Sequence, residues 1–165
     1  MKRFNIYTAT IVLMAFIGFV SLNSCEKKVY EIGEPTSKLE GINGAWNISG
    51  VTQIDEASPL KDEMELDRFF IIPGEPALAI TFNSADLTYS VVPGSGKNPF
   101  GDGGDWIFDD PNFPSSLTLY STGGDTIVVG LGQTIKPTDS NLFLNQQRFC
   151  DDAPVTTYQY IFDRK

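Results

Sequence analysis

The residues that could do chemistry in this 165-residue chain are mainly carboxylates, because the chain contains no histidine. Without histidine, zinc sites and Ser-His or Cys-His nucleophiles are excluded. Two neighbouring pairs, Asp109 with Asp110 and Asp151 with Asp152, could in principle act as the acid and base of a glycosidase. Both pairs adjoin proline-containing turns, where Asp commonly hydrogen-bonds to local backbone. We therefore interpret them as turn residues and predict that the protein is not an enzyme.

Acidic side chains also gather around a glycine-rich stretch, where calcium is the ion to consider. Asp102, Asp105, Asp109 and Asp110 carry the hard oxygen ligands that Ca²⁺ takes. The EF-hand spacing is absent, however, and the last two residues lie beyond an intervening predicted strand. The glycines at 101–104 do not connect a strand to a helix, so they do not fit a phosphate-binding loop. We predict a solvated loop with no metal and no cofactor, and calcium binding remains the alternative.

The first 25 residues have the organisation of a targeting segment. Two basic residues precede an apolar run at 11–20, which is the length of a signal-peptide core and short for a membrane span. Leu22, Ser24 and Cys25 then form a pattern that resembles the lipobox of bacterial lipoproteins. We predict that residues 1–24 are a lipoprotein signal peptide and that Cys25 is the lipidation site.

Lipidation at Cys25 predicts membrane attachment. The resemblance to bacterial lipoproteins implies a diacylglyceryl thioether on this residue and an acylated α-amino group. Each buried methylene contributes about 0.8 kcal/mol, so several acyl chains together anchor a protein stably. Residues 25–38 mix charges with Gly and Pro and are predicted to be the lipidated Cys and a flexible tether. We expect a location in the bacterial cell envelope at the outer membrane, with the periplasmic or surface face left open.

The second cysteine, Cys150, has no intramolecular partner if Cys25 carries lipid. It follows Phe149 on a predicted apolar strand. A lone cysteine in that setting is most often a small buried hydrophobe, and we interpret Cys150 in this way.

The charge of the chain excludes some partners. It has 12 basic and 21 acidic residues, and losing the two basic residues of the signal peptide leaves ten against 21, a net charge of −11. Nucleic-acid phosphates require patches of Lys and Arg, so binding to nucleic acid is not expected. A polybasic membrane-binding face is excluded for the same reason. The acidic surface is most simply a solubility feature.

Residues 39–165 are predicted to form one all-β domain. Alternation of apolar and polar residues over 46–54 predicts the first strand, and turn-forming residues separate the later ones. A short helical turn is expected over 39–44, and a helix from Ser58 and Pro59 to about Arg68. Short strands joined by hairpins favour an antiparallel meander closed into a barrel, or a sandwich. The further strands are predicted at 77–82, 87–92, 106–108, 116–120, 126–131, 141–149 and 155–163.

Several short motifs resemble a known family. Gly44-Ala45-Trp46 opens the first strand and Gly104-Asp105-Trp106 opens a middle one, and the chain closes with Tyr158-Gln159-Tyr160-Ile161-Phe162. Together they resemble an uncharacterised family of lipocalin-like lipoproteins from Bacteroidota-type bacteria. The resemblance implies a lipocalin-like meander barrel of about eight strands with one short helix, and attachment to a membrane through lipid. It implies no activity.

Aromatic residues at strand spacing are the candidates for barrel closure and ligand binding. Trp46 is expected to close one barrel end with Arg148 over its ring, and Arg164 is the alternative cation. A filled aromatic core is the default interpretation, and a pocket near the open end, bounded by residues 93–105, is the main functional possibility. The candidate ligand-binding residues are Trp106, Tyr89, Phe108, Tyr158 and Tyr160.

Two functions follow from this interpretation. The first is a lipid-anchored, non-enzymatic protein that binds a small apolar or glycan ligand in the barrel. The second is an accessory or structural interaction protein of an outer-membrane complex, with a filled barrel and an envelope protein partner. An aromatic-lined cavity favours the first, and a solid core favours the second.

Overall fold

The strands of this protein form one antiparallel sheet that closes on itself between its first and last members. The computed structural model describes residues 36–165, so the signal peptide, Cys25 and most of the tether lie outside the described residues. The elements are α2 (Lys38–Ile42), β1 (Gly44–Asp55), β2 (Glu63–Glu65), the 3₁₀ helix η2 (Asp67–Phe69), β3 (Ala79–Asn83), β4 (Thr88–Val92), β5 (Gly103–Phe108), β6 (Ser116–Ser121), β7 (Thr126–Leu131), β8 (Asn141–Cys150) and β9 (Ala153–Arg164).

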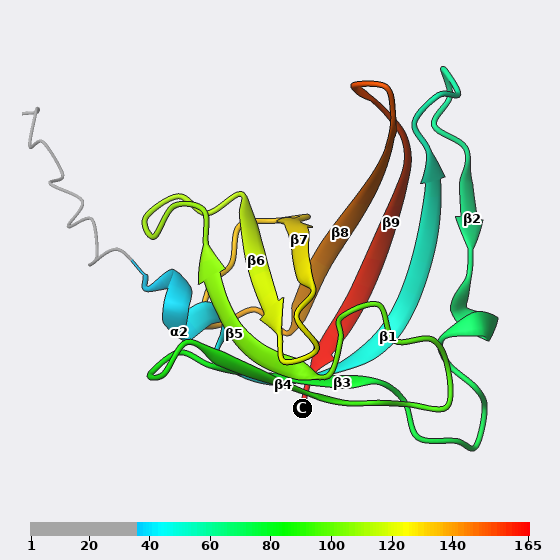
Figure 1. The fold of residues 1–165 in the computed structure, drawn as a ribbon. Coiled ribbons are helices and arrows are strands. Elements are labelled where there is room, and N and C mark those ends of the chain that lie inside the picture. Colours follow the sequence, from blue (N-terminus) through cyan, green and yellow to red (C-terminus); the bar gives the residue numbers. More distant parts are fainter. Residues whose placement is uncertain (1–35) are drawn as a thin grey trace, which may run out of the picture. The chain divides into compact units, whose positions relative to one another are not determined.

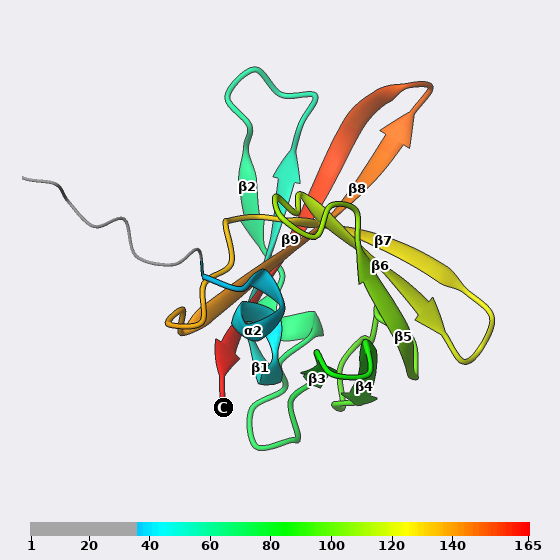
Figure 2. The same ribbon diagram turned by 90° about the vertical axis from the view of Figure 1, so that its left-hand side faces the viewer.

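Eight of these strands, β1 and β3 to β9, make a closed antiparallel barrel (Figures 1 and 2). Each strand pairs with the next along the chain, and β9 returns to pair with β1 from Trp46↔Arg164 to Asp55↔Thr156. The prediction of an all-β meander barrel with about eight strands and a short helix is therefore confirmed. The helical turn at the domain entrance is also present as α2, which Ser37 caps by accepting a hydrogen bond from Glu40 N.

The predicted helix at 58–68 is wrong. Asp55 accepts hydrogen bonds from the backbone N–H groups of Ala57 and Ser58, which turns the chain as soon as β1 ends. Lys61 has a φ of 49°, which a right-handed helix cannot include. The chain then runs back along β1 as β2, with Gln53↔Met64 as the central pair, before forming the short η2. Pairing with β1 thus overrides the local helix signals of Ser58 and its neighbours.

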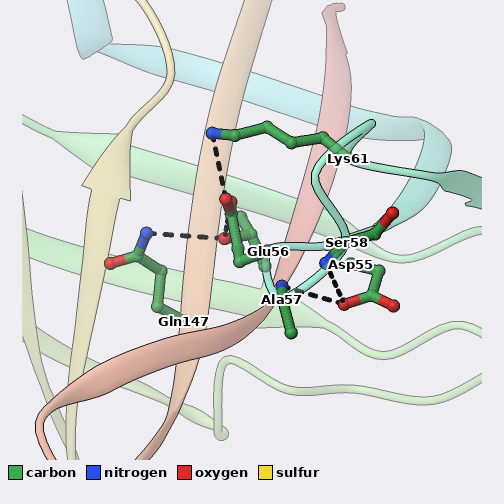
Figure 3. A network of polar contacts seen from close by, with 7 residues as sticks. Asp55, Glu56, Ala57, Ser58, Lys61 and Gln147 are labelled. Carbon is green, nitrogen blue, oxygen red and sulfur yellow. Dashed lines mark hydrogen bonds and ion pairs between the residues drawn. The ribbon is translucent and has the colours of Figure 1, made fainter.

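The strands β8, β9, β1 and β2 continue beyond the rest of the barrel (Figures 1 and 2). This part, called the extension below, consists of β2 with residues 51–55 of β1, 153–159 of β9 and 146–150 of β8. A polar network binds its outer face to the β1–β2 turn (Figure 3). There Glu56 accepts a 2.7 Å hydrogen bond from Thr157 and pairs with Lys61 at 3.1 Å, while Gln147 donates to Thr157.

The barrel wall opens where β7 and β8 diverge. These strands pair only at Gly130↔Asn145 and Leu131↔Leu144. Residues 126–129 of β7 pair with β6 instead, and residues 146–150 of β8 pair with β9. Among the described residues, these two segments therefore have no strand partner on the edge that faces the opening.

Aromatic and aliphatic side chains fill the barrel below this opening. Trp46 also donates from Nε1 to the carbonyl of Ile42, so α2 is attached to the closed end of the core. The largest side chains with almost no exposed surface are Trp46, Trp106, Phe82, Phe100, Phe162, Ile42, Leu78, Ile80, Leu117, Leu119, Leu142 and Leu144. The default expectation of a filled aromatic core is correct for this part of the barrel.

Candidate functional site

The divergence of β7 and β8 leaves an open pocket of about 860 Å³. The extension forms one wall, β7 another, and the segments around η2 and residue 98 the remainder. Its lining residues are Gln53, Leu66, Phe69, Phe70, Lys97, Asn98, Pro99, Thr126, Ile127, Val128, Gln146, Gln147, Arg148, Tyr158 and Tyr160.

Strand register explains why the polar lining residues share one face. Gln146 is paired with Tyr158, and Tyr158 with Gln53 on the other side of β9. Side chains at paired positions project to the same face of a sheet, and so do residues two apart along a strand. Arg148 therefore shares the face of Gln146, and Tyr160 that of Tyr158. The pocket is the continuation of the core face into the extension, where glutamine, tyrosine and arginine replace leucine and phenylalanine.

Tyr160 forms the boundary between core and pocket. It is 3 % exposed, and its ring contacts Phe70 and Phe100 edge-on, with centroids 5.7 and 5.0 Å away. Its hydroxyl donates to Gln146 Oε1 at 3.3 Å. Burial raises the pKa of Tyr160 to about 12, so the phenol stays protonated and acts as a donor at neutral pH.

Tyr158 and Arg148 lie on the same wall of the pocket, farther from the core than Tyr160 and Gln146. The Arg148 guanidinium carbon is 5.7 Å from the centre of the Tyr158 ring, within the range of a cation–π contact. Tyr158 is partly buried and Arg148 is exposed. The pocket therefore offers an aromatic ring and a planar cation close to its opening.

The loop between β4 and β5 closes one side of the pocket. Asn98 holds the loop in shape by donating to Gly101 O at 2.8 Å and accepting from Phe100 N at 3.0 Å. Gln146 Nε2 donates to the carbonyl of Pro99, which joins the loop to β8. The interpretation that residues 93–105 bound a pocket is correct for the part at Lys97 to Pro99.

Three of the five predicted ligand-binding residues belong to the filled core. Trp106 contacts Phe82 and Phe108 edge-on at 5.6 and 5.0 Å, and its Nε1 donates to Thr88 O. Tyr89 is buried and donates to Phe100 O at 3.0 Å. None of the three lines the pocket, whereas Tyr158 and Tyr160 do. Trp106, Tyr89 and Phe108, which were predicted to bind a ligand, pack in the core instead, because their side chains are buried and lie outside the pocket lining.

The glycines before Trp106 serve strand packing. Gly104 has a φ of 150°, and a Cβ at this position would lie 2.0 Å from the carbonyl oxygen of Tyr120. Only glycine allows β5 to approach β6 so closely. The glycine-rich stretch that suggested a ligand role for Trp106 therefore has a structural cause.

The cation over Trp46 is Arg164, and the preferred candidate Arg148 is wrong. Arg164 lies 4.2 Å from the centre of the Trp46 ring, whereas Arg148 is at the pocket. The register decides between them, since Arg164 is the β9 partner of Trp46 and Arg148 is opposite Thr156.

The carboxylates of the β5–β6 connection bind local backbone, as predicted. Asp109 accepts hydrogen bonds from the Ser115 hydroxyl and from the N–H groups of Ser115 and Ser116. These bonds, the Ser115 hydroxyl foremost, hold the pKa of Asp109 well below its ordinary value. Asp110 accepts from the next two available N–H groups, those of residues 112 and 113. Within residues 36–165, no three acidic or thiol side chains gather into a metal-binding group.

Cys150 is exposed, so the prediction that it is buried is wrong. It lies at the tip of the β8–β9 hairpin, where the extension has passed the end of the core, and Asp151 beside it turns with a φ of 47°. Among the described residues, no helix is long and apolar enough to cross a membrane.

Sequence reasoning missed the polar wall of the pocket. Gln53, Gln146 and Lys97 line it, and none was a candidate. A signal was present in β8, where the inward positions change from Leu142 and Leu144 to Gln146 and Arg148. Such a change from apolar to polar residues within one strand face marks the end of the packed core.

The fold and the pocket define a class: a closed antiparallel barrel with a filled base and an amphipathic pocket that opens through its wall. Comparison of the chain with family models, with curated proteins and with solved structures finds no match. The resemblance to lipocalin-like lipoproteins therefore stays a proposal.

Proposed function

We propose that this protein is a lipid-anchored lipoprotein of the bacterial outer membrane whose lipocalin-like barrel binds a small glycan or apolar ligand without chemically changing it. The observation that carries the binding proposal is the pocket itself, with Tyr158 and Tyr160 on the face that continues the core. Its volume of about 860 Å³ falls within the range of small-molecule sites, about 300–1,000 Å³.

The chemistry of the lining favours a ligand with both polar and apolar faces. Tyr158 offers a ring for stacking, and Gln53 and Gln146 offer amide donors and acceptors beside it. Phe69 on η2, which is 45 % exposed, and Ile127 on β7 provide apolar surface on the other walls of the pocket. A sugar ring has this combination of polar edges and apolar faces, and an acyl chain would use the apolar side alone.

The test is whether a ligand co-purifies with the protein and whether its binding depends on a residue of the pocket. The full chain is purified from its bacterial host in mild detergent and analysed by native mass spectrometry, beside Tyr158→Ala. Tyr120→Ala is the matched control, because Tyr120 is 48 % exposed on β6 and does not line the pocket. We expect a bound mass on the unaltered protein and on Tyr120→Ala, and its loss from Tyr158→Ala. Equal occupancy in all three proteins, or none in any, would count against the binding proposal.

A second candidate function, interaction with an envelope protein, has one observation in its favour. Leu60 is 86 % exposed and Phe149 is 61 % exposed, and both lie near hairpin tips of the extension. Exposed apolar side chains of this kind are common at protein interfaces. Crosslinking in cells tests this candidate. Leu60→Ser with Phe149→Ser should lose a specific crosslinked partner that Phe113→Ser retains, since Phe113 is 84 % exposed but lies outside the extension.

A further inference from the structure

The pocket has a charge opposite to that of the chain. The chain carries 21 acidic and 12 basic residues, yet the lining contains two cations, Lys97 and Arg148, and no Asp or Glu. The two cations come from different elements, the β4–β5 loop and β8. Lysine and arginine in the lining of a pocket without carboxylates create a positive local potential in an acidic surface.

Neither cation is neutralised within residues 36–165. The ion pair described in this part of the chain joins Lys61 to Glu56 (Figure 3) and includes neither Lys97 nor Arg148. The Arg148 guanidinium contacts the Tyr158 ring at 5.7 Å, which leaves its N–H donors free to bind another group. An arginine steadied by an aromatic face and lacking a carboxylate partner is a common arrangement for recognising a planar anion.

The residues paired with Arg148 or next to it on its face are neutral. Across the strand it faces Thr156, and on its own face the next residues are Gln146 and Tyr158. The carboxylate of Asp55, beyond Thr156 in the register, accepts hydrogen bonds from the N–H groups of Ala57 and Ser58. Tyr160, on the pocket floor, has a pKa raised by burial and remains uncharged at neutral pH. A ligand anion would therefore meet neutral donors and two cations, with no carboxylate in the lining to repel it.

We propose that the ligand of this pocket carries an anionic group, a carboxylate or a sulfate, which Arg148 binds while Tyr158 packs against the adjoining part of the ligand. The inference rests on the proposed binding function and narrows it. Two sources share this chemistry: an acidic sugar, and an acyl chain with a carboxylate head. Lys97 adds a second, longer-range attraction from the loop side of the opening.

The experiment uses four soluble probes and the full chain in nanodiscs of uncharged phosphatidylcholine. Trigalacturonate and octanoate carry carboxylates, and a neutral galactose trisaccharide and octanol are their uncharged counterparts. Binding is measured by isothermal titration calorimetry at low salt, for the unaltered protein, Arg148→Gln, Arg148→Lys and Lys136→Gln. Lys136 is exposed and outside the pocket, so its variant changes the net charge equally and serves as the control. Titration of each alkyl probe into empty nanodiscs measures its partition into lipid, and this contribution is subtracted before charged and neutral probes are compared.

We expect at least one carboxylate probe to bind the unaltered protein tenfold or more tightly than its neutral counterpart. Arg148→Gln should remove most of this difference, Arg148→Lys should keep part of it, and Lys136→Gln should leave it unchanged. The sugar and alkyl arms identify the source of the anion. Equal binding of charged and neutral probes, or equal effects of Arg148→Gln and Lys136→Gln, would overturn the anionic assignment and leave the binding function standing. If no probe of either kind bound, both proposals would be overturned.

Discussion

The guanidinium group of Arg164 lies 4.2 Å above the centre of the Trp46 ring, at the point where the last strand of the barrel closes on the first. Its three nitrogens donate to the carbonyls of Asp139, Asn43 and Gly41 at 2.9, 2.9 and 2.6 Å. One side chain thus covers the buried indole and satisfies three carbonyls from two separate segments, the end of α2 and the loop at Asp139. Among the described contacts, this residue is central to holding the closed end of the barrel.

Replacing Arg164 should destabilise the fold. Arg164→Lys keeps the charge but loses the planar arrangement of donors, and we expect a loss of about 2 kcal/mol in the free energy of unfolding, from several charge-assisted hydrogen bonds and one cation–π contact. Urea denaturation measures it. Arg148→Lys, which makes the same exchange at the exposed pocket cation, should change the free energy of unfolding by less than about 0.5 kcal/mol. Equal effects at the two sites would contradict the closure role of Arg164.

The division between core and pocket predicts opposite phenotypes for two aromatic residues. Trp106→Phe loses buried area and the hydrogen bond to Thr88 O, so unfolding should become easier by roughly 2 kcal/mol while ligand occupancy is unchanged. Tyr158→Ala should lose occupancy with a smaller change in stability, because Tyr158 is partly exposed. Thermal denaturation and native mass spectrometry separate the two effects. Loss of occupancy in Trp106→Phe at full stability would contradict its placement in the core.

Gly104 should not tolerate a side chain. Because a Cβ would lie 2.0 Å from the Tyr120 carbonyl oxygen, Gly104→Ala must push β5 away from β6 and should cost at least about 2 kcal/mol. Gly123→Ala, in the adjacent β6–β7 turn, meets only Ser121 Oγ at 3.7 Å and is the control, with an expected change within about 0.5 kcal/mol. Urea denaturation of both variants measures the difference. Similar stabilities would show that the strands can separate freely.

The stability contribution of Glu56 should depend on pH. The hydrogen bond from Thr157, followed by the contact with Lys61, lowers the pKa of Glu56 below its ordinary value of 4.5. A lowered pKa in the folded state means that the contribution is present above pH 4.5 and is lost as the pH falls below it. Glu56→Gln should therefore lower the melting temperature at pH 7 and have little effect at pH 3. Glu65→Gln, at an exposed carboxylate of β2, is the control. A Glu56→Gln effect of the same size at both pH values would contradict this assignment.

Lipidation at Cys25 predicts that substitutions of the two cysteines have different effects on membrane attachment. Cys25→Ser should move the protein from the membrane fraction to the soluble fraction, because the substitution removes the thiol to which we propose that lipid is attached. Cys150→Ser should leave the protein in the membrane fraction, since Cys150 is at an exposed hairpin tip. Fractionation and immunoblotting of both variants test this expectation. Cys25→Ser protein that still pelleted with membranes would contradict the anchor.

The sequence determined the architecture of this protein well, because strand alternation and turn composition are local properties. The hairpins around the predicted turns at residues 83–86, 121–125 and 150–154 lie within a few residues of their observed positions. The turn role of Asp109 was also predictable, since its partners lie within seven residues of it. The lipobox-like pattern at Cys25 is likewise a matter of local spacing, and its function remains a prediction.

Only the tertiary structure decided which distant residues meet. Arg164 rather than Arg148 covers Trp46 because the register of β9 on β1 places it there, and register is fixed by pairing along the whole strand. Pairing with β1 likewise turned the helix-like segment after Ser58 into β2. The pocket exists because β7 and β8 share only two paired positions, a non-local outcome that no single segment encodes. The same divergence leaves Tyr158 facing the pocket and Trp106 packed in the core. Both are aromatic residues in strands of alternating apolar and polar residues, so the local pattern does not distinguish them.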